Sequence, residues 1–110
     1  MNFGQMKDAM ALKAKLSKME KELKHTRLSA EAQAGKIVVV VNGAGEAIEI
    51  KIEDELLSPS RRKDLEKGLA YAFNQAREAA GRLSQEKFQE LVNSLPPEMR
   101  SALGGMGMPG

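Results

Sequence analysis

The stretch from Val38 to Ile52, VVVVNGAGEAIEIKI, holds two strand-like segments of opposite character around a glycine turn. Its first four residues are all valine, which predicts a strand that is buried on both faces. From Ala47 onward, isoleucines alternate with charged residues, as expected for a strand with one buried face. The residues Asn42-Gly43-Ala44-Gly45 between them favour a hairpin turn, because asparagine and glycine tolerate positive φ.

The segments before this hairpin complete a small sheet and add a helix. Between Thr26 and Ala34 apolar and polar residues alternate, which suits a short strand as well as a frayed helix end, and Gly35 follows as a turn. The three strands together predict an antiparallel meander. From Phe3 to His25 the spacing is helical, with a coiled-coil-like seam. That seam is formed by Ala9, Leu12, Leu16, Met19 and Leu23.

A second long helix is predicted after the hairpin. Ser58 is placed to cap it and Pro59 suits a first helical position. An apolar stripe runs to Leu83 and then shifts to another face, so we expect a bend or break near Ser84. The pair Pro96-Pro97 is expected to end helical structure. The fold class is therefore α+β, with one domain over residues 1–95 and a flexible Pro/Gly/Met-rich tail over residues 96–110.

Composition excludes several classes of site. The chain has 110 residues, no cysteine and a formal net charge of +2, so disulfides and thiolate metal sites are excluded. The only histidine, His25, falls at a helix end, where a surface or capping role is expected. Gly43 and Gly45 lead into a strand and lack the Lys-Ser/Thr pair of a phosphate loop. We therefore expect no enzyme activity, no metal and no cofactor. No leader or membrane-spanning run is recognised, so a cytoplasmic location is expected.

Basic residues gather in two places, and each has two interpretations. A lysine-rich face on the first helix is either a solvated surface or an edge that faces phosphates. Its residues are Lys7, Lys15, Lys18, Lys21 and Lys24. The second cluster, Arg61-Arg62-Lys63, falls in the first turn of the second helix, where the helix dipole already disfavours cations. These residues are either compensated by acids such as Glu66 or available to an anion.

Five features follow one another along the chain: Ala34-Gly35, the Val39–Gly43 turn, the Ile52–Leu57 exit, the Ala72–Ala76 core segment and a methionine/glycine/proline tail. In this order, they resemble the YbaB/EbfC family of nucleoid-associated proteins. The resemblance implies an α-β-β-β-α domain that forms a tight homodimer through its sheet and binds DNA with little sequence preference. It also implies a bacterial protein of the nucleoid, without enzyme activity or a cofactor.

The leading hypothesis is thus a dimeric DNA-binding protein of the nucleoid, with a role in its organisation and in gene regulation. Its phosphate contacts would come from the two basic clusters, and its dimer interface from the strand that is apolar on both faces. The interface residues are Val38, Val39, Val40 and Val41. The alternative is a chaperone-like adaptor that grips protein partners with the helix seam and the late apolar face of Phe88, Leu91 and Leu95.

Overall fold

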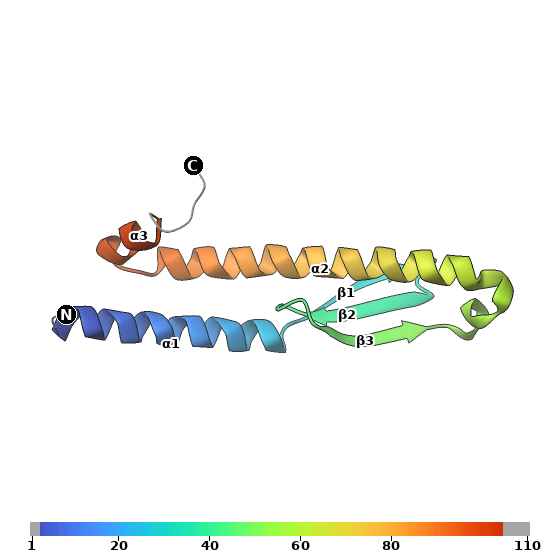
Figure 1. Ribbon diagram of the computed structural model, residues 1–110, viewed down its shortest axis with the longest axis horizontal. Coiled ribbons are helices and arrows are strands. Elements are labelled where there is room, and N and C mark those ends of the chain that lie inside the picture. The colour runs from blue at the N-terminus through green and yellow to red at the C-terminus, as the bar shows by residue number, and fades with distance from the viewer. Residues whose placement is uncertain (1–2, 105–110) are drawn as a thin grey trace.

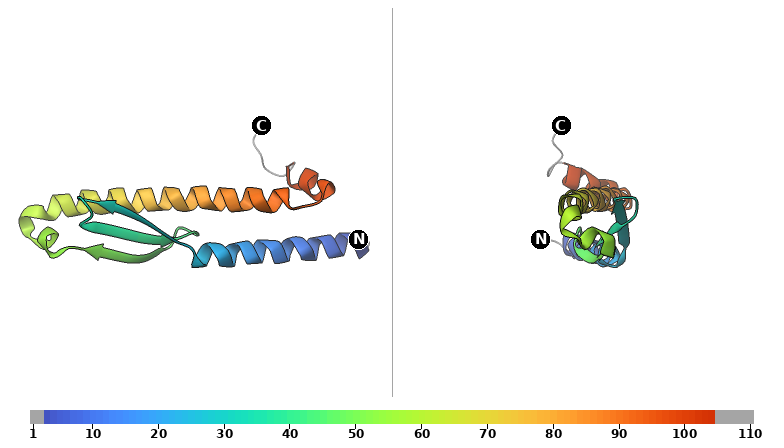
Figure 2. Two further views of the ribbon diagram at one scale, coloured as in Figure 1. Left: turned by 180° about the vertical axis from the view of Figure 1, so that it is seen from behind. Right: turned by 90° about the vertical axis from the view of Figure 1, so that its right-hand side faces the viewer.

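The computed structural model describes residues 3–104 and has the predicted α-β-β-β-α order, followed by one more short helix (Figure 1). It is an elongated molecule of 67 × 29 × 18 Å. One long helix runs along most of the molecule, with a shorter antiparallel helix beside one half of it and the sheet beside the other half (Figure 2). The helices are α1 (Phe3–His25), α2 (Arg62–Asn93) and α3 (Pro97–Gly104), the strands are β1 (Arg27–Ala32), β2 (Ile37–Asn42) and β3 (Ala47–Ile52), and two 3-10 turns are η1 (Asp54–Leu57) and η2 (Pro59–Arg61).

The sheet is the predicted antiparallel meander in the order β1-β2-β3. Leu28 lies opposite Val41 in the first pair, and Val39 lies opposite Ile50 in the second. A bulge between Val40 and Val41 interrupts the second ladder. The turn from β1 to β2 uses positive φ at three consecutive residues and ends on Gly35 at φ +83°, which glycine adopts at little cost. β2 is therefore the central strand, and β3 is an outer strand.

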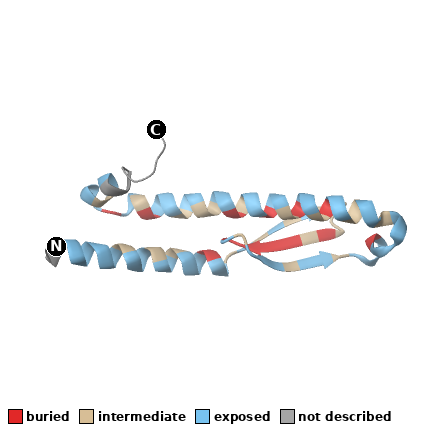
Figure 3. Ribbon diagram, in the orientation of Figure 1, coloured by how far each residue is buried: buried red, intermediate tan, exposed pale blue. Residues whose placement is uncertain are grey.

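The core lies between α2 and one face of the sheet, chiefly over β1 and β2 (Figure 3). Ile37, Val39 and Val41 are fully buried there. α2 presents small residues to these three side chains, which allows the helix to lie close to the sheet. A Cβ on Gly68 would come within 2.7 Å of the Ile37 Cδ1 atom. Alanines at 72, 76 and 80 continue this small-residue face along α2. The helix stripe expected from the sequence is thus confirmed as the cover of the sheet.

The other face of β2 is covered without a helix. Val40 is only 8% exposed, although it points away from α2. The Arg27 Nη2 atom on β1 lies 2.8 Å from the Glu49 Oε2 atom on β3. Since these strands flank β2, and Glu49 is paired directly with Val40, the ion pair crosses β2 above the valine. Much of the burial on this face is therefore supplied by the chain itself.

Two expectations about the helices are wrong, and a third is confirmed only in part. α2 has no break near Ser84; its apolar face rotates there because the helix leaves the sheet and packs against α1 instead. Ser58 makes no side-chain capping bond, and the α-helix begins three residues after Pro59, at Arg62. α2 does end before the double proline, but Pro97 then opens α3, where proline's fixed φ is compatible with a first turn.

Candidate nucleic-acid interface

α1 extends beyond the sheet as an arm, and the β2–β3 turn holds its base. The Gly43 amide donates to the Leu23 carbonyl at 2.7 Å and to the Thr26 carbonyl at 3.1 Å. The Leu23 carbonyl, one of the last four of α1, also accepts from the Thr26 amide at 3.2 Å, so the end of the helix is bonded both to the turn and to the residue that follows it. Asn42 shapes the turn, because its Oδ1 accepts from the amides of Ala44 and Glu46, each at 3.0 Å. The direction of α1 is consequently fixed by the hairpin that follows it in sequence.

The apolar seam of α1 faces α2, and the lysines take the remaining surface. Leu23 is buried, and Leu12, Leu16 and Met19 are half-buried against the second helix. The five predicted lysines are all exposed: Lys7, Lys15, Lys18, Lys21 and Lys24. Among the described residues, Lys7, Lys18, Lys21 and Lys24 have no acidic partner within ion-pair distance. The arm therefore carries a row of lysines that form no direct ion pair within residues 3–104.

A groove between α1 and α2 gathers further charged groups. Lys15 and Lys18 line it from α1, and Lys87 with Glu90 line it from α2. The Lys15 Nζ atom donates to Ser94 Oγ at 3.3 Å, so this lysine leans toward α2. Lys87 lies 3.5 Å from Glu22, in the ion pair that joins the two helices. The sequence prediction did not include Lys87 among the site residues. The pattern that could have indicated it is its position in the apolar stripe of α2, where an apolar residue is expected.

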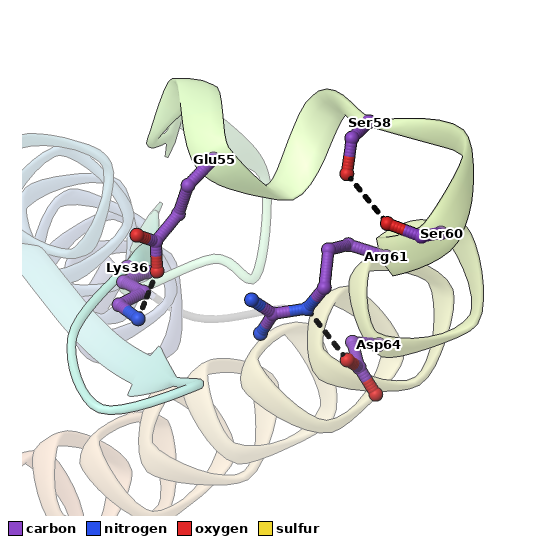
Figure 4. Close-up of polar contacts among 6 residues, drawn as sticks. All are labelled: Lys36, Glu55, Ser58, Ser60, Arg61 and Asp64. Carbon is purple, nitrogen blue, oxygen red and sulfur yellow. Dashed lines mark hydrogen bonds and ion pairs between the residues drawn. The ribbon is translucent and has the colours of Figure 1, made fainter.

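The second basic cluster lies at the opposite end of the molecule from the α1 arm (Figure 1). Arg61 pairs with Asp64 at 2.8 Å, and the Arg62 Nε atom lies 2.8 Å from Glu66 (Figure 4 shows the first pair). Lys63 is exposed and has no ion-pair partner among the described residues. Acids thus compensate both arginines, as the first of the two interpretations expects. Within one chain the two clusters do not form a continuous surface.

The same end holds a carboxyl group, that of Glu55, with a shifted pKa. The Lys36 ammonium forms a hydrogen-bonded ion pair with Glu55 and lowers the pKa of that carboxyl below its ordinary value (Figure 4). Charge on Arg61 acts in the same direction. The pair ties the start of β2 to η1. It is a structural contact at the protein surface, because Glu55 is exposed.

Other kinds of site find little support in residues 3–104. The described part of the chain has no cluster of three or more histidine, cysteine or acidic side chains that could hold a metal. The His25 Nδ1 atom lies 2.7 Å from the Lys21 carbonyl, as expected for a histidine at a helix end. None of the helices described here is long and apolar enough to cross a membrane.

The four valines of β2 divide between the two faces of the sheet. Val39 and Val41 are fully buried under α2. Val38 and Val40 point to the opposite face, where Val38 is partly exposed. Only these two offer any surface to a second chain.

Comparison with known proteins gives consistent results. A model of the YbaB/EbfC DNA-binding family matches residues 1–95. A nucleoid-associated protein of Rhodospirillum rubrum is 35% identical over 101 residues, covering 89% of this chain and 94% of the relative. One from Dictyoglomus thermophilum is 32% identical over 94 residues, covering 86% and 90%. The crystal structure of an uncharacterized Helicobacter pylori protein has the same fold, with a TM-score of 0.74 at 24% identity, covering 84% of this chain and 98% of that one.

Proposed function

The chain belongs to the YbaB/EbfC DNA-binding family, and on that premise we propose that it is a dimeric nucleoid-associated protein that binds duplex DNA through its α1 arm. The relatives named above carry the description nucleoid-associated protein. Such a protein acts in the cytoplasm on the nucleoid, where it would organise DNA and influence transcription. Neither role requires catalysis or a cofactor.

The observation that carries the proposal is the row of lysines along α1 that lack acidic partners. Twenty-three residues give the helix a length of about 34 Å at 1.5 Å per residue. One turn of B-DNA has about the same length. A straight arm that lies along a duplex can therefore meet phosphates over roughly one turn without reading base edges, which favours binding with little sequence preference. The arginines at the far end contribute less, because acids already neutralise them.

The test is fluorescence anisotropy of a labelled duplex across a series of salt concentrations. Counterion release predicts a log–log slope of about −0.9 for each phosphate that is contacted. Lys18→Glu/Lys21→Glu should lower the affinity at least tenfold and flatten the slope. The matched variant Lys63→Glu/Lys67→Glu makes the same change of net charge at the far end and should change the affinity much less. An affinity that does not change with salt concentration, or an equal loss of affinity in both variants, would show that α1 is not the DNA-binding surface.

One observation favours the adaptor alternative. Phe88 of the predicted late apolar face is 44% exposed, whereas Leu91 and Leu95 of that face are buried, and Met10 on the arm is 70% exposed. Exposed apolar side chains on helices are typical of surfaces that bind other proteins. Affinity purification from nuclease-treated lysate separates the two functions: partners that remain without nucleic acid support an adaptor, and their complete loss supports DNA binding.

A further inference from the structure

The β2–β3 turn contains Asn42-Gly43, a dipeptide that is prone to spontaneous deamidation. In this reaction the backbone nitrogen of the second residue gives its proton to a base and attacks the side-chain carbonyl carbon of asparagine. A new N–C bond forms, the bond from that carbon to Nδ2 breaks, and the amino group takes a proton from water and leaves as ammonia. Water then opens the cyclic succinimide at either carbonyl, which leaves aspartate or isoaspartate. Glycine as the second residue favours the attack, because it has no side chain to obstruct it and is free in its backbone angles.

Both reacting groups are occupied by hydrogen bonds in the folded chain. The Gly43 amide, which would attack, donates to the carbonyls of Leu23 at 2.7 Å and Thr26 at 3.1 Å. The Asn42 side chain donates from Nδ2 to Glu46 Oε1 at 2.8 Å, and its Oδ1 accepts two backbone amides of the turn. Asn42 is also only 7% exposed. The Gly43 nitrogen therefore has to lose both of its bonds before it can react.

The nearer of the two acceptors belongs to α1, and α1 is held by little buried surface. Leu23 is the only buried residue of the apolar seam, and the other four seam residues are half-buried or exposed. Residues 4–11 of the helix are exposed throughout. Segments with few buried apolar contacts open locally at a lower free energy than the whole domain unfolds. Local opening at the base of α1 would free the Gly43 amide while the sheet and α2 stay folded.

We propose that Asn42 is a deamidation site controlled by α1: the reaction proceeds in molecules whose helix has left the β2–β3 turn, and its product keeps the helix loose. Deamidation is slow compared with local opening, so its rate follows the fraction of open molecules. The extent of the modification thus measures how long the arm has spent away from the turn. The inference does not depend on DNA binding, and loss of DNA binding in the α1 lysine variants would leave it intact.

The products of the reaction do not fit the turn. Aspartate at position 42 lacks the Nδ2 donor, so its carboxylate faces the Glu46 carboxylate across the former hydrogen bond of 2.8 Å. Two like charges so close together repel, more strongly at a partly buried site than in water. Isoaspartate also lengthens the backbone by one carbon atom. It converts the Asn42 carbonyl, which accepts the Gly45 amide at 2.9 Å, into a free carboxylate.

Mass spectrometry of proteolytic peptides measures deamidation at Asn42 in the full chain, incubated at neutral pH without DNA. The folded wild type should react at least roughly tenfold more slowly than the same chain in denaturant. Leu23→Ala removes the buried anchor at the base of α1 and should speed up the reaction several-fold in protein that circular dichroism shows to be folded. Leu56→Ala is the matched control, because Leu56 is fully buried in η1 and does not pack on α1.

Urea unfolding separates local opening from global unfolding in these variants. It gives the globally unfolded fraction of each protein, and the product of this fraction and the rate in denaturant is the rate expected from global unfolding alone. The Leu23→Ala rate should exceed this product by more than the wild-type rate does, and the excess in Leu56→Ala should equal that of the wild type. Equal rates in the folded and denatured wild type, or no larger excess in Leu23→Ala than in Leu56→Ala, would overturn the proposal.

A reciprocal pair of substitutions tests the effect of the product on α1. Asn42→Asp imitates the aspartate product, and hydrogen exchange at the Gly43 amide should become roughly tenfold faster. Asn42→Asp/Glu46→Gln exchanges the donor and the acceptor, so slow exchange should return. Glu46→Gln alone keeps an acceptor for the asparagine and should exchange like the wild type. Wild-type exchange in Asn42→Asp, or no recovery in the double variant, would refute the claim that the product loosens α1.

Discussion

Gly43→Ala should destabilise the protein because the new methyl group would press on the end of α1. A Cβ at this position would lie 2.8 Å from the Leu23 carbonyl oxygen and 2.9 Å from its Cδ2 atom. The oxygen belongs to backbone, so relief requires the turn to move away from the helix. That movement stretches the bonds from the Gly43 amide to Leu23 and Thr26. At about 0.5–1.5 kcal/mol for each weakened hydrogen bond, with a similar amount for overpacking, we expect a loss of roughly 1–3 kcal/mol.

The assay is equilibrium unfolding in urea, followed by circular dichroism, with two matched glycine controls. Gly81 lies on α2 with open space around its would-be Cβ, so Gly81→Ala should stabilise the protein by up to about 1 kcal/mol. Gly45 also has open space but a φ of +84°, so Gly45→Ala reports backbone strain alone, about 1 kcal/mol. If the free energy of unfolding of Gly43→Ala equals that of the wild type, or is lowered no more than that of Gly45→Ala, the contact with α1 does not hold the turn in place.

Three further changes test other contacts. Gly68→Ala places a methyl 2.7 Å from Ile37 Cδ1 and should lower the free energy of unfolding by roughly 1–3 kcal/mol; an unchanged melting temperature would contradict this. Asn42→Ala leaves the amides of the turn without their acceptor and should cost about 1–3 kcal/mol in urea unfolding, with a wild-type midpoint as the opposing result. The lowered pKa of Glu55 means that its pair with Lys36 stabilises the fold above the ordinary value of 4.5 and is lost as pH falls through the lower folded pKa. Glu55→Gln should remove that part of the acid sensitivity, and unfolding curves from pH 7 to 3 that match the wild type would refute it.

Local pattern was enough to predict the three strands. The all-valine segment, the Asn-Gly turn and the alternating isoleucines predicted β2 and β3 within a residue at each end. The alternation from Thr26 to Ala34 likewise predicted β1. These features depend on the period of a strand and on the φ preferences of glycine and asparagine, which act over a few residues.

The lysines of α1 show where sequence reasoning about the site succeeds and where it stops. A helical wheel separates them from the apolar seam, and the structure confirms that all five are exposed. The helical wheel does not show that Lys15 leans toward Ser94. Nor does it show that Lys87, about seventy positions further along the chain, lines the same groove as Lys15 and Lys18. The same limit applies to Arg61 and Arg62. Which acids pair with them depends on where α2 begins, and the sequence alone placed that start too early.

The sequence by itself determined the order of the elements, the apolar character of β2 and the basic face of α1, because each is a property of neighbouring residues. Only the tertiary structure decided which partner each face meets. It placed α2 over β1 and β2, so that Val39 and Val41 lie in the core, Val40 lies under an ion pair and Ile50 stays exposed at the edge. It also shows that α2 is continuous past Ser84, because the helix stops packing on the sheet there and packs on α1 instead. Such choices depend on contacts between residues far apart in the chain, which periodicity does not encode.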